Sequence, residues 1–105
     1  MDAEPLKGHL DGLILAVLAG GPLHGYAVIE ALKEKSDGVL ELPEGTVYPA
    51  LHRLERDGLL SSDWSAETGR RRRVYRLTHR GKRGLTERRA GWRAFSTTID
   101  AVLAG

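Results

Sequence analysis

The spacing of apolar residues changes along this chain, and the order of the changes constrains the fold more than any other feature. Near the start of the chain, apolar side chains recur at i, i+3, i+4, i+7 and i+8, which predicts a helix with one buried face. They are Leu10, Leu13, Ile14, Val17 and Leu18. Gly20-Gly21-Pro22 then ends this helix. A second helix is predicted from His24 to about Ser36, with Asp37-Gly38 after it.

A third helical stretch follows residues 39–42, an apolar run that the pattern leaves as either a strand or an extended segment. Its apolar side chains fall at i, i+4 and i+7, at Val47, Leu51 and Leu54. Proline is tolerated only near the first turn of a helix. Pro49 therefore predicts a helix that begins between Thr46 and Tyr48 and ends at Asp57-Gly58.

Period-two alternation then replaces the helical spacing. The alternating positions are Leu60, Ser62 and Trp64, followed by Arg73, Tyr75 and Leu77. With Gly69 in the connection, they predict a β-hairpin, and we expect Trp64 to lie in the core. Thr78 is suited to cap a last helix that runs from His79 nearly to the end of the chain.

Three helices followed by a hairpin are the order of a winged helix-turn-helix. The predicted fold class is therefore mainly α with a small β-hairpin. Residues 1–78 form the winged helix-turn-helix, a DNA-binding domain, and residues 79–105 a C-terminal dimerisation helix. In such a domain the third helix presents its outer face to base edges in the major groove. Gly45 and Thr46 are small enough to let its backbone approach DNA.

Charge is distributed unevenly along the chain. Residues 1–69 hold five Lys and Arg against twelve Asp and Glu, a balance of −7, whereas residues 70–105 hold eleven against two, a balance of +9. A concentrated basic segment indicates a polyanionic partner, nucleic acid before a membrane surface, and beside the predicted winged helix-turn-helix we expect double-stranded DNA. The longest apolar stretch, around Leu13 to Ala19, is too short to span a bilayer, so we expect a cytoplasmic protein without membrane contact.

The residues that catalysis or metal binding would need are missing or badly spaced. The chain has no Cys, and its histidines (His9, His24, His52 and His79) do not occur at ligand spacing. Neither a Ser/His/Asp grouping nor a glycine-rich phosphate loop is evident. We therefore expect no enzyme, no metal and no cofactor.

The last helix carries more apolar surface than a small domain needs. Leu85, Trp92 and Ile99 recur every seven residues, with Phe95 and Val102 at the complementary heptad position. Such a helix extends about 40 Å. A second copy of the chain is the simplest partner for this stripe, which predicts a homodimer.

Three segments together resemble PadR-like transcriptional regulators. They are residues 42–60 (LPEGTVYPALHRLERDGLL), residues 23–26 (LHGY) and residues 69–78 (GRRRRVYRLT) with Gly81 after them. The resemblance runs in register from about residue 9 to residue 85 and is closest to the small subfamily with a single C-terminal helix. It implies a bacterial dimeric repressor that binds a pseudo-palindromic operator.

Candidate DNA contacts lie on the third helix, at the start of the second helix and at the hairpin. They are Gly45, Thr46, Tyr48, Pro49, His52 and Arg53, then Tyr26, then Arg70, Arg71 and Arg72. The two tyrosines either pack at the edge of the core or offer a hydroxyl to a phosphate. His52 and Arg53 either contact DNA or brace neighbouring helices. Arg73 begins a strand and is expected to pair with an acid such as Asp63.

Trp92 and Phe95 have two interpretations. They are either plain anchors of the dimer interface or an effector site, because small PadR-like regulators can carry an apolar pore where flat drug-like molecules stack on aromatic rings. An alternative function for the whole chain is a winged-helix module that binds RNA or a protein without operator specificity.

Overall fold

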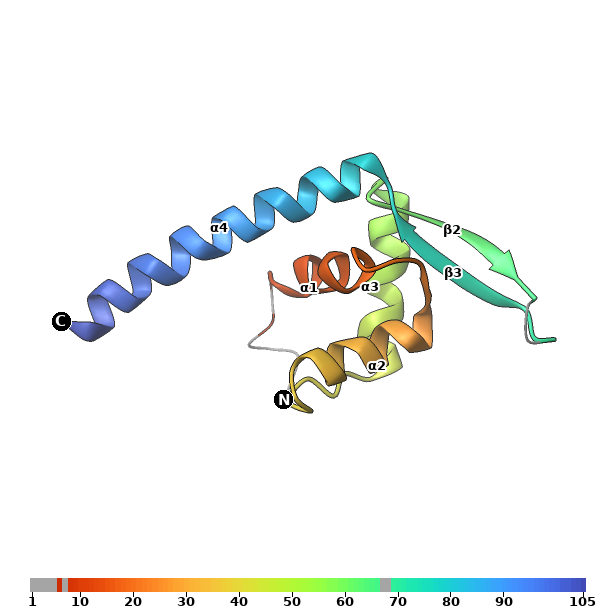
Figure 1. Cartoon of the computed structure of the whole chain (residues 1–105), viewed down its shortest axis with the longest axis horizontal. Helices are drawn as coiled ribbons and strands as arrows, with labels where there is room; N and C mark the ends of the chain where they lie inside the picture. The colour runs from red at the N-terminus through yellow and green to blue at the C-terminus, as the bar shows by residue number, and fades with distance from the viewer. Residues whose placement is uncertain (1–5, 7, 67–68) are drawn as a thin grey trace.

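A computed structural model describes residue 6 and residues 8–66 and 69–105 of the chain. The middle of the predicted hairpin loop, residues 67–68, lies outside the described residues. In chain order the described elements are α1 (Leu10–Leu18), β1 (Leu23–His24), α2 (Gly25–Lys35), α3 (Glu44–Arg56), β2 (Leu60–Ser65), β3 (Arg72–Leu77) and α4 (His79–Ala104). The predicted class, mainly α with a small hairpin, is confirmed (Figure 1).

The core lies where α1, α2 and α3 meet the sheet and the first turns of α4. Its fully buried side chains include Ile14, Leu15, Val28, Val47, Leu51, Leu54, Leu60 and Tyr75. The single buried face predicted for α1 is too narrow, because Leu15 is completely buried while Leu10 and Leu13 are only partly covered. The side of α1 that carries Leu15 is covered by the start of α4, since a methyl group added at Gly84 would lie 3.8 Å from Leu15 Cδ1.

The helix α2 matches its prediction, and α3 begins earlier than predicted. His24 caps α2, because its Nδ1 accepts the backbone N–H of Ala27 at 3.2 Å. The carbonyl oxygen of Pro43 accepts the backbone N–H groups of Thr46 and Val47, at 3.0 and 3.2 Å, which starts α3 at Glu44. Pro49 therefore lies inside the helix, where it has no N–H to donate to the carbonyl four residues earlier. The run 39–42 forms neither a helix nor a strand.

The sheet has three antiparallel strands in the order β1-β3-β2. The predicted hairpin is confirmed, with Leu60 opposite Leu77 and Trp64 opposite Arg73. The strand β1 was not predicted, because two residues are too few to show a period. Trp64 is 56% exposed, so the expectation of a core residue was wrong. It shares a face with buried Leu60, but the hairpin projects beyond the body of the domain, and no described helix packs over Trp64 there (Figure 1).

The helix α4 starts as predicted and then leaves the body (Figure 1). The Thr78 hydroxyl accepts the N–H of Gly81 at 3.0 Å, which confirms the cap. A Cβ at Gly81 would lie 2.1 Å from the carbonyl oxygen of Leu59, so glycine is required for this approach. Leu85 is only 5% exposed and belongs to the core of this chain, not to the free stripe of the heptad pattern. The molecule measures 57 × 28 × 20 Å, and α4 sets the long dimension.

Candidate nucleic-acid interface

The helix α3 turns a polar face away from the core. Gly45, Pro49 and His52 are exposed on it, and Thr46 is half-buried. A Cβ at Gly45 would meet no atom within 4 Å, so the backbone there is accessible to a large partner. The structure thus brings these candidates onto one face of the helix.

Arg53 is tied to the neighbouring helix. Its Nη2 lies 2.6 Å from Oδ1 of Asp11 in α1, and Oδ2 of the same carboxylate lies 3.7 Å from Nη2 of Arg88 in α4. Of the two roles considered for Arg53, the structure shows the bracing contact. Asp11 therefore links α3 to α4 through one carboxylate, a link that sequence reasoning missed.

Tyr48 packs against the start of α2. A Cβ at Gly25 would lie only 2.4 Å from Tyr48 Cε1, so a glycine at this position lets the two helices approach. Burial raises the pKa of the Tyr48 hydroxyl, and the nearby Glu44 carboxylate adds to the effect. The half-buried hydroxyl therefore stays protonated at neutral pH and is available as a donor. Tyr26, in the first turn of α2, is 53% exposed.

The hairpin arginines do not share one environment. Arg73 Nη2 lies 3.5 Å from Oε2 of Glu55 at the end of α3, and Arg76 forms the ion pair with Asp63. The expected pairing of Arg73 with Asp63 was wrong because the register puts Arg73 opposite Trp64, so Arg73 and Asp63 point to opposite faces of the sheet. Arg70 and Arg71 are exposed near the tip.

Arg72 faces a residue that the sequence interpretation left out of the site. Its Nη1 lies 3.0 Å from Nε2 of His24, the residue that caps α2. The short strand β1 makes this contact possible, because it pairs His24 with Val74 on β3. A strand of two residues is too short to produce a periodic pattern that would predict it from the sequence.

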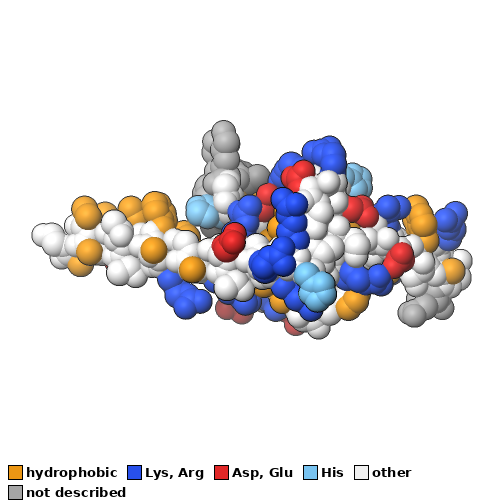
Figure 2. All heavy atoms as spheres, turned by 90° about the horizontal axis from the view of Figure 1, so that it is seen from above, with side chains coloured by type: hydrophobic (Ala, Val, Ile, Leu, Met, Phe, Trp, Pro, Cys, Tyr) orange, Lys and Arg blue, Asp and Glu red, His pale blue; other side chains and the backbone are white. Residues whose placement is uncertain are grey.

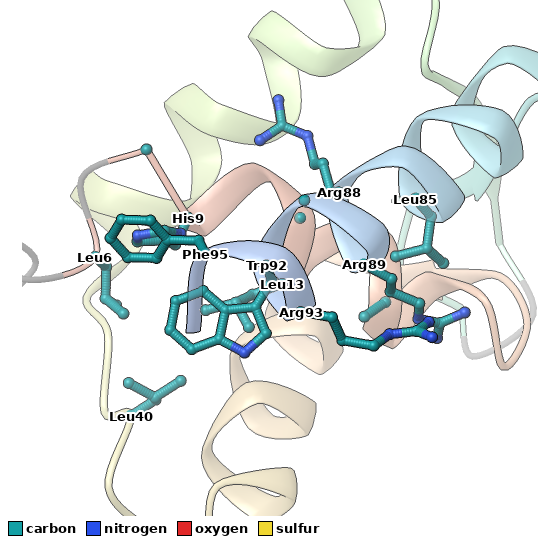
Figure 3. A pocket seen from close by; sticks show the side chains of 14 residues that line it. Leu6, His9, Leu13, Leu40, Leu85, Arg88, Arg89, Trp92, Arg93 and Phe95 are labelled. Carbon is teal, nitrogen blue, oxygen red and sulfur yellow. The ribbon is translucent and has the colours of Figure 1, made fainter. Parts of the chain in front are cut away.

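The aromatic residues of α4 line an open groove beside α1 (Figure 3). The rings of Trp92 and His9 meet edge to face at 5.3 Å, and those of Trp92 and Phe95 lie 6.0 Å apart. The groove encloses about 1020 Å³, with Leu13 and Leu40 among its apolar walls. The structure thus brings the two candidate effector residues together.

Further along α4 the apolar side chains have no cover. Ile99 is 40% exposed, Val102 74% and Leu103 78%, and of these Leu103 was not predicted. Figure 2 shows apolar side chains along the projecting helix, and Lys and Arg side chains over the body and at the hairpin end. Within the described residues no group of acidic and histidine side chains could hold a metal ion, and no helix is long and apolar enough to cross a membrane.

The domain has three packed helices, the third of which exposes a polar face, and a basic two-stranded hairpin lies beside it. This arrangement defines a winged helix-turn-helix protein of the DNA-binding class. The model of the transcriptional regulator PadR-like family matches residues 14–87. The chain belongs to this family. It is a family of transcriptional regulators and not of enzymes.

Individual relatives agree with this assignment. The chain is 41% identical over 92 residues to a transcriptional regulator of Mycobacterium tuberculosis, covering 88% of this chain and 80% of the relative. Its fold is similar to a transcriptional regulator from Clostridium thermocellum, with a TM-score of 0.86, 30% identity and coverage of 93% and 96% of the two chains. A PadR-like regulator from Bacillus cereus gives 0.82 at 30% identity, covering 95% and 96%.

Proposed function

We propose that the protein is a homodimeric repressor that binds a pseudo-palindromic operator, and that a flat apolar or aromatic effector releases it. The observation that carries the proposal is the shape of α4, which leaves the body with its apolar side chains exposed. A protein of this kind works where the chromosome is, so we place it in the cytoplasm.

The dimer is supported by the burial along α4. From residue 86 to residue 104 every residue except Ser96 is exposed. A helical segment without tertiary packing is marginal in water, because most helix stability in proteins comes from an apolar face that is covered. Packing the stripe of Trp92, Phe95, Ile99 and Val102 against a second copy supplies that cover.

The DNA-binding mode is supported by the exposed face of α3 and by the hairpin. In a symmetric dimer two α3 helices would enter successive major grooves about 34 Å apart. The contact of Arg72 with His24 favours a phosphate at the hairpin. A neutral imidazole has one acceptor nitrogen, and in His24 this is Nδ1, which accepts the N–H of Ala27. The hydrogen is then on Nε2, so Nε2–H and the Arg72 guanidinium are two donors whose nitrogens lie 3.0 Å apart. A phosphate oxygen between them would accept from both.

The effector is supported by the groove that Trp92 and Phe95 line. Ligand sites of this kind are mostly apolar, with a few polar groups that fix orientation. Trp92 is 53% exposed, so a planar molecule can stack on its ring. Titration with a panel of planar apolar compounds should quench its fluorescence, and Trp92→Phe in a still-folded dimer should abolish that signal. A panel that leaves the fluorescence unchanged would argue against the effector.

The decisive test of the function is selection of bound duplexes from random-sequence DNA, followed by footprinting. We expect one inverted repeat, protected on two half-sites about one helical turn apart and resistant to excess random DNA. An RNA-binding or protein-interaction module would select no preferred duplex. Sedimentation of the same sample should show a dimer.

A further inference from the structure

Trp64 occupies an unusual position for a large aromatic side chain. It lies on β2 near the tip of the hairpin and is 56% exposed. Exposed tryptophans on a small basic element commonly mark a contact surface, because the ring combines a broad apolar face with an electron-rich π system. Trp64 contributes nothing to the core, so the fold does not account for it.

Two guanidinium groups lie over the ring of Trp64. The Cζ atom of Arg71 is 4.6 Å from the ring centroid, and that of Arg73 is 5.3 Å away. Both distances are within the range of a cation–π contact. The register explains one of them, because Arg73 is directly opposite Trp64 across the hairpin.

The two arginines differ in what else they contact. Arg73 also pairs with Glu55 at 3.5 Å, so part of its charge is already compensated. Arg71 has no carboxylate within ion-pair distance among the residues that the structure describes. Of the two arginines that contact the Trp64 ring, Arg71 is therefore the one whose charge is available to a partner.

The geometry of stacking favours an anion as that partner. A guanidinium that stacks uses its face, whereas its N–H donors lie in its plane and point outward from the edge. A contact with the ring at 4.6 Å restricts the long Arg71 side chain, and in a face-on arrangement its hydrogen-bond donors would remain free. A side chain that is ordered before binding loses less conformational freedom when it meets a phosphate.

We propose that Trp64 is a positioning residue that holds Arg71 extended at the hairpin tip, where its guanidinium receives a phosphate of duplex DNA. The inference rests on the proposed DNA contact of the hairpin. It adds that an uncharged residue, Trp64, determines how strongly Arg71 binds a phosphate. An exposed cation–π contact corresponds to about a two- to five-fold change in affinity per hairpin, and about 5- to 30-fold for a dimer.

The test measures binding to a duplex selected from random-sequence DNA, across a series of salt concentrations. The variants are Trp64→Ala, Trp64→Phe, Arg71→Ala and the double substitution of Trp64 and Arg71 by alanine. We expect Trp64→Ala to lower the salt slope although it removes no charge, since the phosphate contact of Arg71 weakens. Trp64→Phe should restore most of the slope, because phenylalanine keeps an aromatic face.

The double variant tests the coupling directly. If Trp64 acts through Arg71, its substitution has little further effect once Arg71 is alanine. Ser61→Ala, on the opposite face of the same strand, is the matched control and should bind as the wild type does. Additive effects of the two alanines, or an unchanged salt slope in Trp64→Ala, would overturn the inference. A wild-type protein that selects no duplex would instead overturn the proposed function.

Discussion

Removing Arg71 and Arg72, two of the three hairpin arginines that form no ion pair among the described residues, should change how DNA affinity depends on salt. The variant carries Arg71→Ala and Arg72→Ala. Neither residue forms an ion pair among the described residues, whereas Arg73 is paired with Glu55 at 3.5 Å. Both are therefore available to phosphates, and the two-fold symmetry of a dimer doubles their number to four contacts.

Counterion release gives the magnitude of the expected change. Each duplex phosphate contact contributes about 0.9 to the slope of log affinity against log salt concentration, so four contacts contribute about 3.6. A fourfold rise in salt should then cost the wild type about 150-fold more affinity than it costs the variant. The loss should be similar on operator and on random duplex DNA, because phosphate contacts carry no sequence information.

The assay is a fluorescence-anisotropy titration of labelled duplex at several salt concentrations. Lys82→Ala with Arg83→Ala is the matched control, since it removes the same charge from exposed positions near the start of α4. We expect the control to keep a slope close to that of the wild type. A hairpin variant with an unchanged slope would refute the assignment of these arginines to phosphates, whatever its affinity.

Three further predictions concern assembly, packing and pH. Trp92→Asp with Ile99→Asp should give a monomer in sedimentation, and an intact dimer would refute the α4 interface. Gly81→Ala should lower the free energy of unfolding by about 3 kcal/mol in thermal melts, because a backbone oxygen would have to move; Gly91→Ala, which meets no atom within 4 Å, should raise it by about 1 kcal/mol. Burial raises the pKa of Tyr48 above the ordinary 10.0. Its contribution to stability is therefore complete below pH 10 and is lost as the pH rises through the raised pKa, so Tyr48→Phe should flatten the alkaline fall measured by denaturant titration.

Local signals in the sequence were sufficient for most elements of the fold. The Thr78 cap, the end of α2 near Asp37-Gly38 and the hairpin follow from residues close together in the chain. Helical spacing of apolar residues located α3, and period-two alternation located the two strands of the hairpin. These features depend on backbone conformation within a few residues, which composition and spacing determine directly.

Features that depend on the surroundings of a residue could not be predicted in this way. Alternation assigned Trp64 to one face of the hairpin but could not show that the hairpin projects beyond the packed body of the domain. The heptad spacing grouped Leu85 with the free stripe, because a period does not distinguish a helix packed on its own chain from one packed on another. The partner of Arg73 depends on strand register, and the contact of His24 depends on a strand of two residues.

Pro49 has a mechanical consequence for the helix that is proposed to read DNA. In a regular helix the residue four positions after Gly45 would donate its N–H to the Gly45 carbonyl, and proline has no N–H to give. The first turn of α3 is therefore joined to the rest of the helix by one hydrogen bond fewer than any later turn. A bend at this point breaks no hydrogen bond at Gly45. The end of the helix that is proposed to approach the bases could therefore follow the local curvature of a groove at a lower energetic cost than a regular helix.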